Sequence, residues 1–201
     1  MKNISWIQAH EAFTIESHAL QKMADFLDKE SFALAVKALA KAPRIATSGC
    51  GHSGIACMHL THLMCCIERP ARFLSPSEAV HGGSGFLNAG DVMIVASRGG
   101  KTAELIPIVE ICKEKKVTVI CITENLKSPL ALNSDIVLGI TVTRETDRDN
   151  QQGTTSFTVT CVLFHALQTA LIEEIDFNKE RYALIHPGGA VGERLNRKKS
   201  K

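Results

Sequence analysis

Two loops of the chain combine glycine with hydroxyl side chains, and such loops suit the binding of phosphate. Residues 48–54 read S-G-C-G-H-S-G, and residues 97–102 read S-R-G-G-K-T. Each loop follows an apolar run and precedes a helical pattern. Glycine lets the backbone approach a ligand closely, and the start of a helix presents free N–H groups and the positive end of its dipole. Together the two loops predict a site for a phosphorylated small molecule.

The first loop also has the spacing of a dinucleotide-binding motif. Gly49, Gly51 and Gly54 satisfy G-x-G-x-x-G, but residues 73–75 read F-L-S where the acidic residue that binds ribose is expected. No G-K-[ST] follows at the spacing of a Walker loop. Either loop could instead be a turn without a ligand, and the second could be a capped helix start with Lys101 in solvent.

Four isolated residues could supply acid–base chemistry: His81, Glu104, Glu145 and His186. Each of them alone also suits a structural or solvated role. Glu104, for example, could be an ordinary first-turn glutamate that complements a helix dipole. The spacing of these residues along the chain does not by itself bring them together.

The predicted helix that follows the first loop carries three side chains of the types that bind metal. His59, His62 and Cys66 recur at helical spacing on one face of that helix. The same face is also its apolar side, and no separate ligand group completes a site. We therefore expect no metal.

Composition indicates one soluble α/β domain of 201 residues, of which 45% are hydrophobic and 22% charged. The net charge of +2 gives no reason to expect nucleic acid as a partner. We expect no membrane span and no signal peptide, because the longest apolar stretches fall short of the roughly 18–20 residues that a span requires. The seven cysteines include no C-x-x-C pair, which is typical of reduced, buried thiols in a cytoplasmic protein.

Strand and helix patterns alternate along the chain from residue 44 to residue 140. We predict strands at 44–48, 71–74, 92–97, 117–123 and 135–140, and helices at 6–27, 29–41, 52–67, 102–115, 154–175 and 178–185. Continuous apolar strands that alternate with helices predict a parallel sheet covered on both faces, which is a three-layer αβα sandwich of flavodoxin-like type. Both glycine-rich loops then fall at the carboxyl edge of the sheet, where such folds bind ligands. We divide the chain into an N-terminal helical extension (1–42), one domain (43–195) and a basic tail (196–201).

The assembled motifs resemble the sugar isomerase (SIS) domain superfamily, and most closely the isomerase domain of arabinose-5-phosphate isomerases. That family carries S-G-x-G-K-S-G, E-A-x-H-G-D, S-x-S-G-E-(T/S)-x-E and H-P-G-G-A-L-G. The corresponding segments here are 48–54, 78–83 (E-A-V-H-G-G), 97–104 (S-R-G-G-K-T-A-E) and 186–192 (H-P-G-G-A-V-G). The resemblance ends near residue 195, before the CBS pair that follows in many relatives.

The resemblance implies interconversion of an aldose phosphate and a ketose phosphate, without a cofactor or a metal. It implies a proton shuttle at Glu145, a ring-opening group at His186, and supporting roles for Glu104 and His81. It also implies a homo-oligomer, a dimer or a tetramer, because sites of this superfamily are often completed across a subunit interface. The residues that would hold phosphate or sugar hydroxyls are Ser48, Gly49, Gly51, His52, Ser53, Ser97, Lys101, Thr102, Thr154, Thr155 and Ser156.

Four positions depart from the family pattern. His52 replaces the lysine of the first loop, Gly99 replaces a serine, Lys101 replaces a glutamate, and Gly83 replaces an aspartate. Lys101 could replace the missing cation near the phosphate. The departures leave a second interpretation open, a phosphosugar-binding or sensing protein without catalysis. No DNA-binding helix-turn-helix is visible before residue 44, which weighs against a regulator.

Overall fold

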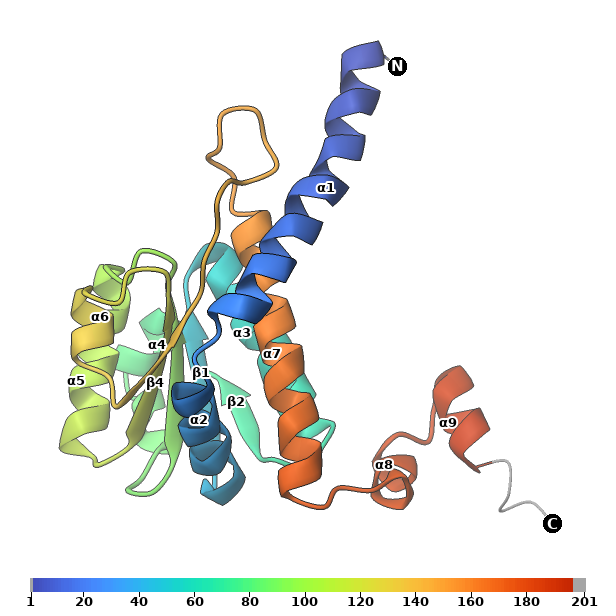
Figure 1. Cartoon of the computed structure of the whole chain (residues 1–201). Coiled ribbons are helices and arrows are strands. Elements are labelled where there is room, and N and C mark those ends of the chain that lie inside the picture. The colour runs from blue at the N-terminus through green and yellow to red at the C-terminus, as the bar shows by residue number, and fades with distance from the viewer. Residues whose placement is uncertain (1, 197–201) are drawn as a thin grey trace.

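Five parallel strands form one sheet in the order β2-β1-β3-β4-β5, as the flavodoxin-like prediction requires (Figure 1). The computed structural model of the protein describes residues 2–196. In the sheet register Gly49 lies opposite Ala96, which in turn lies opposite Ile122, so the central strands end side by side. The strands are β1 (Ile45–Gly49), β2 (Ala71–Phe73), β3 (Val92–Ala96), β4 (Thr118–Thr123) and β5 (Ile136–Gly139).

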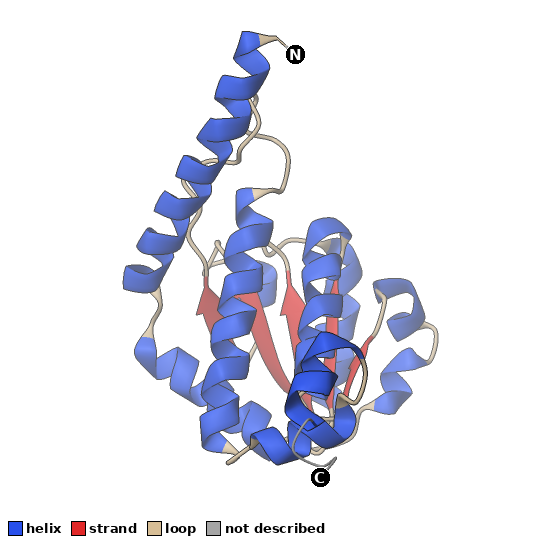
Figure 2. Ribbon diagram, turned by 90° about the vertical axis from the view of Figure 1, so that its right-hand side faces the viewer, coloured by secondary structure: helices blue, strands red, loops and turns tan. Residues whose placement is uncertain are grey.

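Helices cover both faces of the sheet and make the predicted three layers (Figures 1 and 2). One face carries α2 (Lys29–Lys41), α3 (Gly51–Cys65) and α7 (Thr155–Glu174). The other carries α4 (Pro76–Val80), α5 (Ile106–Glu114) and α6 (Pro129–Leu132), with the short 3-10 turns η1 (Gly83–Phe86) and η2 (Ala103–Leu105). The N-terminal half of α1 (Asn3–Phe26) projects past the sheet, while α8 (Lys179–Ile185) and α9 (Gly189–Asn196) follow the end of α7.

The hydrophobic core consists of two clusters, one on each side of the sheet. Successive residues of a strand point to opposite faces, so Ile94 packs with α3 and α7 whereas Met93 and Val95 pack with α5. Every residue of β1 and β3 is buried, as expected for parallel strands covered on both faces. The burial of Leu39 shows that α2 also packs into the core. The division of the chain at residue 42 stays a prediction, and residues 197–201 of the predicted tail lie outside the described residues.

The helix predicted for residues 102–115 starts with a 3-10 turn. Residues 103–105 form the 3-10 turn η2, and the α-helix begins only at Ile106, with Pro107 in its first turn. Proline lacks an N–H group and favours the first turn of a helix, which explains this late start. Glu104 therefore lies in the 3-10 turn that leads directly into α5, within the segment predicted as a helix.

By length and composition, α7 is long enough and apolar enough to cross a membrane, and it is the one such helix in the described part of the chain. It packs against α1, α2 and α3, and Phe164, Leu167 and Leu171 on it are fully buried. These contacts make it the central core helix of the α/β fold. The prediction that every apolar stretch is too short for a span did not anticipate this helix.

The seven cysteines are free thiols. Burial raises the pKa of the Cys57, Cys112 and Cys121 thiols to about 12. Cys65, in contrast, is exposed. The prediction that the thiols are buried therefore holds for only some of them, and their reduced state stays a prediction.

Candidate active site

The two glycine-rich loops leave adjacent strands at the same edge of the sheet. The first follows β1 and the second follows β3, whose last residues, Gly49 and Ala96, are paired in the register. The edge is also reached by residues 140–154, which connect β5 to α7 (Figure 1). Three segments far apart in the sequence therefore meet at the carboxyl edge of the sheet, where open α/β folds bind ligands.

Close packing of the first loop explains its glycines. A Cβ atom on Gly54 would lie 2.6 Å from the carbonyl oxygen of Gly49, and Gly51 has a left-handed backbone with φ +53°. Helix α3 begins at Gly51 without a capping side chain. The first turn of α3 therefore keeps N–H groups and a positive dipole end that can meet an anion.

The second loop is a folded turn. The Ser97 hydroxyl accepts the N–H of Gly100 at 3.1 Å and lies 2.8 Å from the Thr102 hydroxyl. Gly100 has φ +66°, and a Cβ atom there would lie 2.0 Å from Oγ of Ser128. Lys101 is exposed beyond this turn. The loop thus brings hydroxyls to the edge of the sheet, and its lysine points to solvent.

A small cavity lies between the first turns of α3 and α7. Its volume is about 20 Å³, room for roughly one water molecule. The positive dipole ends of both helices face it, which favours an anion there. Its polar lining comes from His52, Ser53, Ser97, Arg98, Ser156 and Thr160.

Two further hydroxyls of the predicted phosphosugar set are buried near these loops. Ser48 is the next-to-last residue of the buried strand β1, and Thr155 begins α7. Neither hydroxyl oxygen has a hydrogen-bond partner within residues 2–196. A buried hydroxyl without a partner costs about 1–3 kcal/mol, so a polar ligand near either oxygen would lower that cost.

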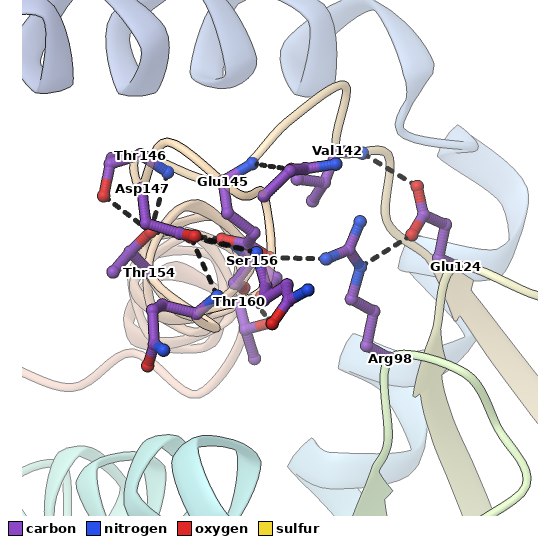
Figure 3. A network of polar contacts seen from close by, with 12 residues as sticks. Arg98, Glu124, Val142, Glu145, Thr146, Asp147, Thr154, Ser156 and Thr160 are labelled. Carbon is purple, nitrogen blue, oxygen red and sulfur yellow. Dashed lines mark hydrogen bonds and ion pairs between the residues drawn. The ribbon is translucent and has the colours of Figure 1, made fainter.

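Arg98 is at the centre of the polar network at this edge (Figure 3). Its Nε donates to Glu124 at 2.8 Å, and its Nη1 donates to Glu145 at 2.5 Å. The other carboxylate oxygen of Glu124 accepts the N–H of Val142 at 3.1 Å. Through these two ion pairs, Arg98 connects the second loop to the end of β4 and to the segment before α7.

Glu145 is fully buried and caps the start of α7. Beyond its ion pair with Arg98, its Oε2 accepts the backbone N–H of Ser156 at 3.1 Å and the Thr154 hydroxyl at 3.3 Å. The next residues form a tight turn, in which the backbone N–H of Gln151 bonds to Asp147 and lowers the pKa of that carboxyl. Through its bonds to Ser156 and Thr154, Glu145 contacts the predicted polar helix start at residues 154–156.

Glu104 and His81 lie at the same edge, on elements that touch. Helix α4, which His81 follows, contacts η2, which contains Glu104. Both side chains are exposed. Burial and the nearby charge of Glu104 raise the pKa of the Cys50 thiol, which indicates that Glu104 faces the first loop.

His186 is the one predicted catalytic residue at the opposite end of the domain. It follows α8, beyond the C-terminal end of α7, whereas Glu145 precedes the N-terminal end (Figure 1). A helix of 20 residues is about 30 Å long, so one chain does not bring the two side chains together. His186 packs against Tyr182, and its Nδ1 is buried without a hydrogen-bond partner in the described chain.

His59, one of the potential metal ligands on α3, pairs with a histidine of α7. Nε2 of His59 lies 2.9 Å from Nε2 of His165 on α7, and the ring centroids are 5.2 Å apart. These values place the two nitrogens head to head, as in an N–H···N hydrogen bond. Within residues 2–196, no group of three or more histidine, cysteine or acidic side chains could hold a metal ion.

The sequence interpretation missed Arg98 and Glu124 as site residues. Arg98 stands inside the second loop, and Glu124 directly follows β4. Charged residues that follow adjacent parallel strands meet at one edge, and this signal could have identified the pair.

Comparisons with known proteins bear on the family and the fold of the chain. A family model described as the SIS domain matches residues 38–170. The arabinose 5-phosphate isomerase KdsD of Francisella tularensis is 33% identical over 191 residues, covering 93% of this chain and 58% of that protein. The chain spans about half the length of the curated relatives it matches.

Solved structures share the whole fold. A proposed sugar-phosphate isomerase from Listeria monocytogenes superposes with a TM-score of 0.90 at 35% identity, covering 94% of this chain and 100% of that one. The protein c3406 of Escherichia coli CFT073, in complex with arabinose 5-phosphate, has a TM-score of 0.85 at 29% identity, covering 93% and 100% of the two chains. The match over two thirds of the sequence, together with this shared fold, shows that the chain belongs to the SIS domain family.

Proposed function

We propose that the chain is a sugar-phosphate isomerase that interconverts an aldose phosphate and a ketose phosphate. The observation that carries the proposal is the meeting of a buried carboxylate, Glu145, with Arg98 and two helix N-termini at one edge of the sheet. The cation and the helix ends suit a phosphate dianion, and the carboxylate suits proton transfer. The named isomerases that this chain resembles support the same reaction class.

The reaction needs only the movement of protons within one substrate. After the sugar ring opens, a carboxylate removes the proton from C2 of the aldose, and the C1 carbonyl oxygen gains a proton to give a cis-enediol. The same carboxylate then returns a proton to C1 while the C2 hydroxyl loses its proton, which yields the ketose. No electron leaves the substrate, so this chemistry requires no redox cofactor.

We assign the proton shuttle to Glu145 and ring opening to His186, with Glu104 and His81 orienting hydroxyls or polarising the carbonyl. The phosphate and the sugar hydroxyls would be held at the ends of β1, β3 and α7. Of the residues predicted for this role, His52, Ser53, Ser97 and Ser156 line the cavity, which supports their assignment. Lys101 keeps its assignment as a hypothesis.

A complete site would then need two copies of the chain. About 30 Å of helix α7 separates the end near Glu145 from the end near His186. We propose that His186 serves the site of a neighbouring copy in a homodimer or homotetramer, in the cytoplasm. The seven free thiols are consistent with a reducing compartment.

The substrate that we favour is arabinose 5-phosphate, with ribulose 5-phosphate as the product. The E. coli complex with arabinose 5-phosphate and the KdsD relatives support this choice. The test is a turnover assay against a panel of pentose and hexose phosphates, read as aldose–ketose conversion. Conversion of one of them by the wild type, lost in Glu145→Gln, supports the assignment.

The alternative is a protein that binds a phosphosugar without converting it. The replacement of the family lysine by His52 and of a family serine by Gly99 is the feature that favours this alternative. Tight binding of a phosphosugar, with no conversion across the panel, would replace the isomerase proposal with this one.

A further inference from the structure

Arg98 is the one permanently charged side chain among the described residues that line the cavity. The other basic side chain there is the imidazole of His52. Lys101, which the sequence suggested as the cation for phosphate, does not line the cavity and is exposed. Any electrostatic recognition of phosphate inside this cavity therefore depends first on Arg98.

The guanidinium of Arg98 has capacity for a further anion. It carries five N–H donors, of which one is given to Glu124 and one to Glu145. The Arg98 side chain is 37% exposed, whereas that of Glu145 is 1% exposed. A phosphate can thus reach Arg98 from solvent while the carboxylate stays behind it.

Glu145 is held in a state that opposes its proposed role as a base. Its two oxygens accept hydrogen bonds from Arg98, Ser156 and Thr154. Both oxygens are therefore occupied, and the side chain is only 1% exposed, so that neither oxygen is free to reach a carbon atom of a bound sugar. The ion pair must loosen before Glu145 can take a proton from carbon efficiently.

We propose that the phosphate of the sugar phosphate binds Arg98 and draws its guanidinium away from Glu145, so that the substrate itself releases the base. This inference rests on the proposed isomerase function. It makes Arg98 the residue that restricts the reaction to phosphorylated sugars, because an unphosphorylated sugar leaves the ion pair intact. Movement of Arg98 would also enlarge a cavity of about 20 Å³, which is too small for the substrate.

The test separates the substrate into two pieces, an unphosphorylated pentose and the phosphite dianion. The wild-type oligomer in deuterated water should exchange the C2 proton of the pentose slowly, and phosphite should raise that rate by roughly tenfold or more. Arg98→Met should lose the stimulation, and Arg98→Lys should recover part of it, because lysine restores the charge but not the planar fork. Stimulation by phosphite that survives in Arg98→Met would overturn the inference.

The matched control is Arg144→Met. Arg144 lies in the same connecting segment as Glu145, but its ion pair is with Glu11 on α1. The stimulation by phosphite should be unchanged in this variant. An equal loss in Arg144→Met and Arg98→Met would assign the effect to the fold of the segment and overturn the inference.

A second readout needs no turnover. The Nε–H signal of Arg98 in an NMR spectrum, identified by its loss in Arg98→Lys, should shift when phosphite is added, while that of Arg144 stays in place. An unmoved Arg98 signal at phosphite concentrations that stimulate exchange would contradict the proposal, even if Arg98→Met fails to fold. If no intact sugar phosphate is converted, the isomerase function fails, whereas a shifted Arg98 signal would still support the anion contact.

Discussion

Arg98 and Glu145 form an ion pair in which Nη1 lies 2.5 Å from Oε1, and this contact joins the loop after β3 to the segment before α7. Figure 3 shows that Glu124 bonds to the same guanidinium from the opposite side. The pair connects strand ends and a helix start that are far apart in the sequence. It is therefore expected to stabilise the edge of the sheet as well as to serve the reaction.

Removal of Arg98 should destabilise the fold because it leaves Glu145 buried without its cation. Arg98→Met is expected to lower the free energy of unfolding by about 1–3 kcal/mol, less than for a fully buried pair because the arginine is partly exposed. Arg98→Met combined with Glu145→Gln should recover part of the loss. Urea unfolding measures both, with Arg144→Met as a control expected to cost under about 1 kcal/mol. An equal loss of unfolding free energy in Arg98→Met and Arg144→Met would show that the burial of Glu145 does not strengthen its ion pair.

Gly100 and its neighbour Gly99 should respond differently to alanine. A Cβ on Gly100 would lie 2.0 Å from Oγ of Ser128 on a backbone with φ +66°, whereas a Cβ on Gly99 would meet nothing within 4 Å. Gly100→Ala should therefore cost about 2–4 kcal/mol in unfolding free energy, and Gly99→Ala under about 0.5 kcal/mol. Chemical denaturation of the two variants checks this, and similar stabilities would contradict the packing of the second loop against Ser128.

The elements of the fold were largely predictable from the sequence. The apolar runs at β1, β3 and β4 alternate with helical patterns, and this arrangement admits few topologies other than a parallel sheet. The sequence did not reveal that residues 103–105 form a 3-10 turn before α5, because these residues still follow a helical pattern. Nor did it reveal that α2 joins the main core, since an alanine- and leucine-rich helix is equally suited to an appended position.

At the candidate site, the sequence indicated the two loops and the helix start at residues 154–156, but it did not indicate Arg98, Glu124 or the contacts among these residues. The polar helix start at residues 154–156 was expected to face a ligand, and the structure shows that it also holds Glu145. That contact depends on the course of residues 140–154, which have no periodic pattern. The separation of His186 from Glu145 depends on the direction of α7, which only the three-dimensional structure gives.

The proposed sharing of His186 between copies predicts complementation. Glu145→Gln and His186→Gln should each be inactive alone, because each site would lack one group. When the two variants are unfolded, mixed and refolded together, some sites should contain neither substitution, and part of the isomerase activity should return. The control is each variant refolded alone. Absence of recovery in mixed oligomers, verified by mass spectrometry, would place His186 in the same site as Glu145 of its own chain or outside the site.

The His59–His165 contact predicts a loss of stability in acid. Burial, together with the nearby charges of His165 and His62, lowers the pKa of His59 below its usual 6.5. The unfolded chain then binds a proton more readily than the folded chain, so stability is present above about pH 6.5 and decreases as the pH falls below it. Melting temperatures from about pH 8 to about pH 5 should fall less for His59→Gln than for the wild type. The exposed His10 gives a control, and equal slopes for His59→Gln and His10→Gln would contradict the prediction.

The measurement that tests the central claim most directly is deuterium incorporation at C2 of arabinose 5-phosphate in deuterated water, followed by NMR. The wild-type protein should incorporate deuterium while it forms ribulose 5-phosphate. Glu145→Gln should reduce the rate by roughly 100-fold or more with an unchanged fold by circular dichroism. Incorporation by Glu145→Gln at the wild-type rate would contradict the role of Glu145, and no incorporation by the wild type into this or any other sugar phosphate would contradict the assignment as an isomerase.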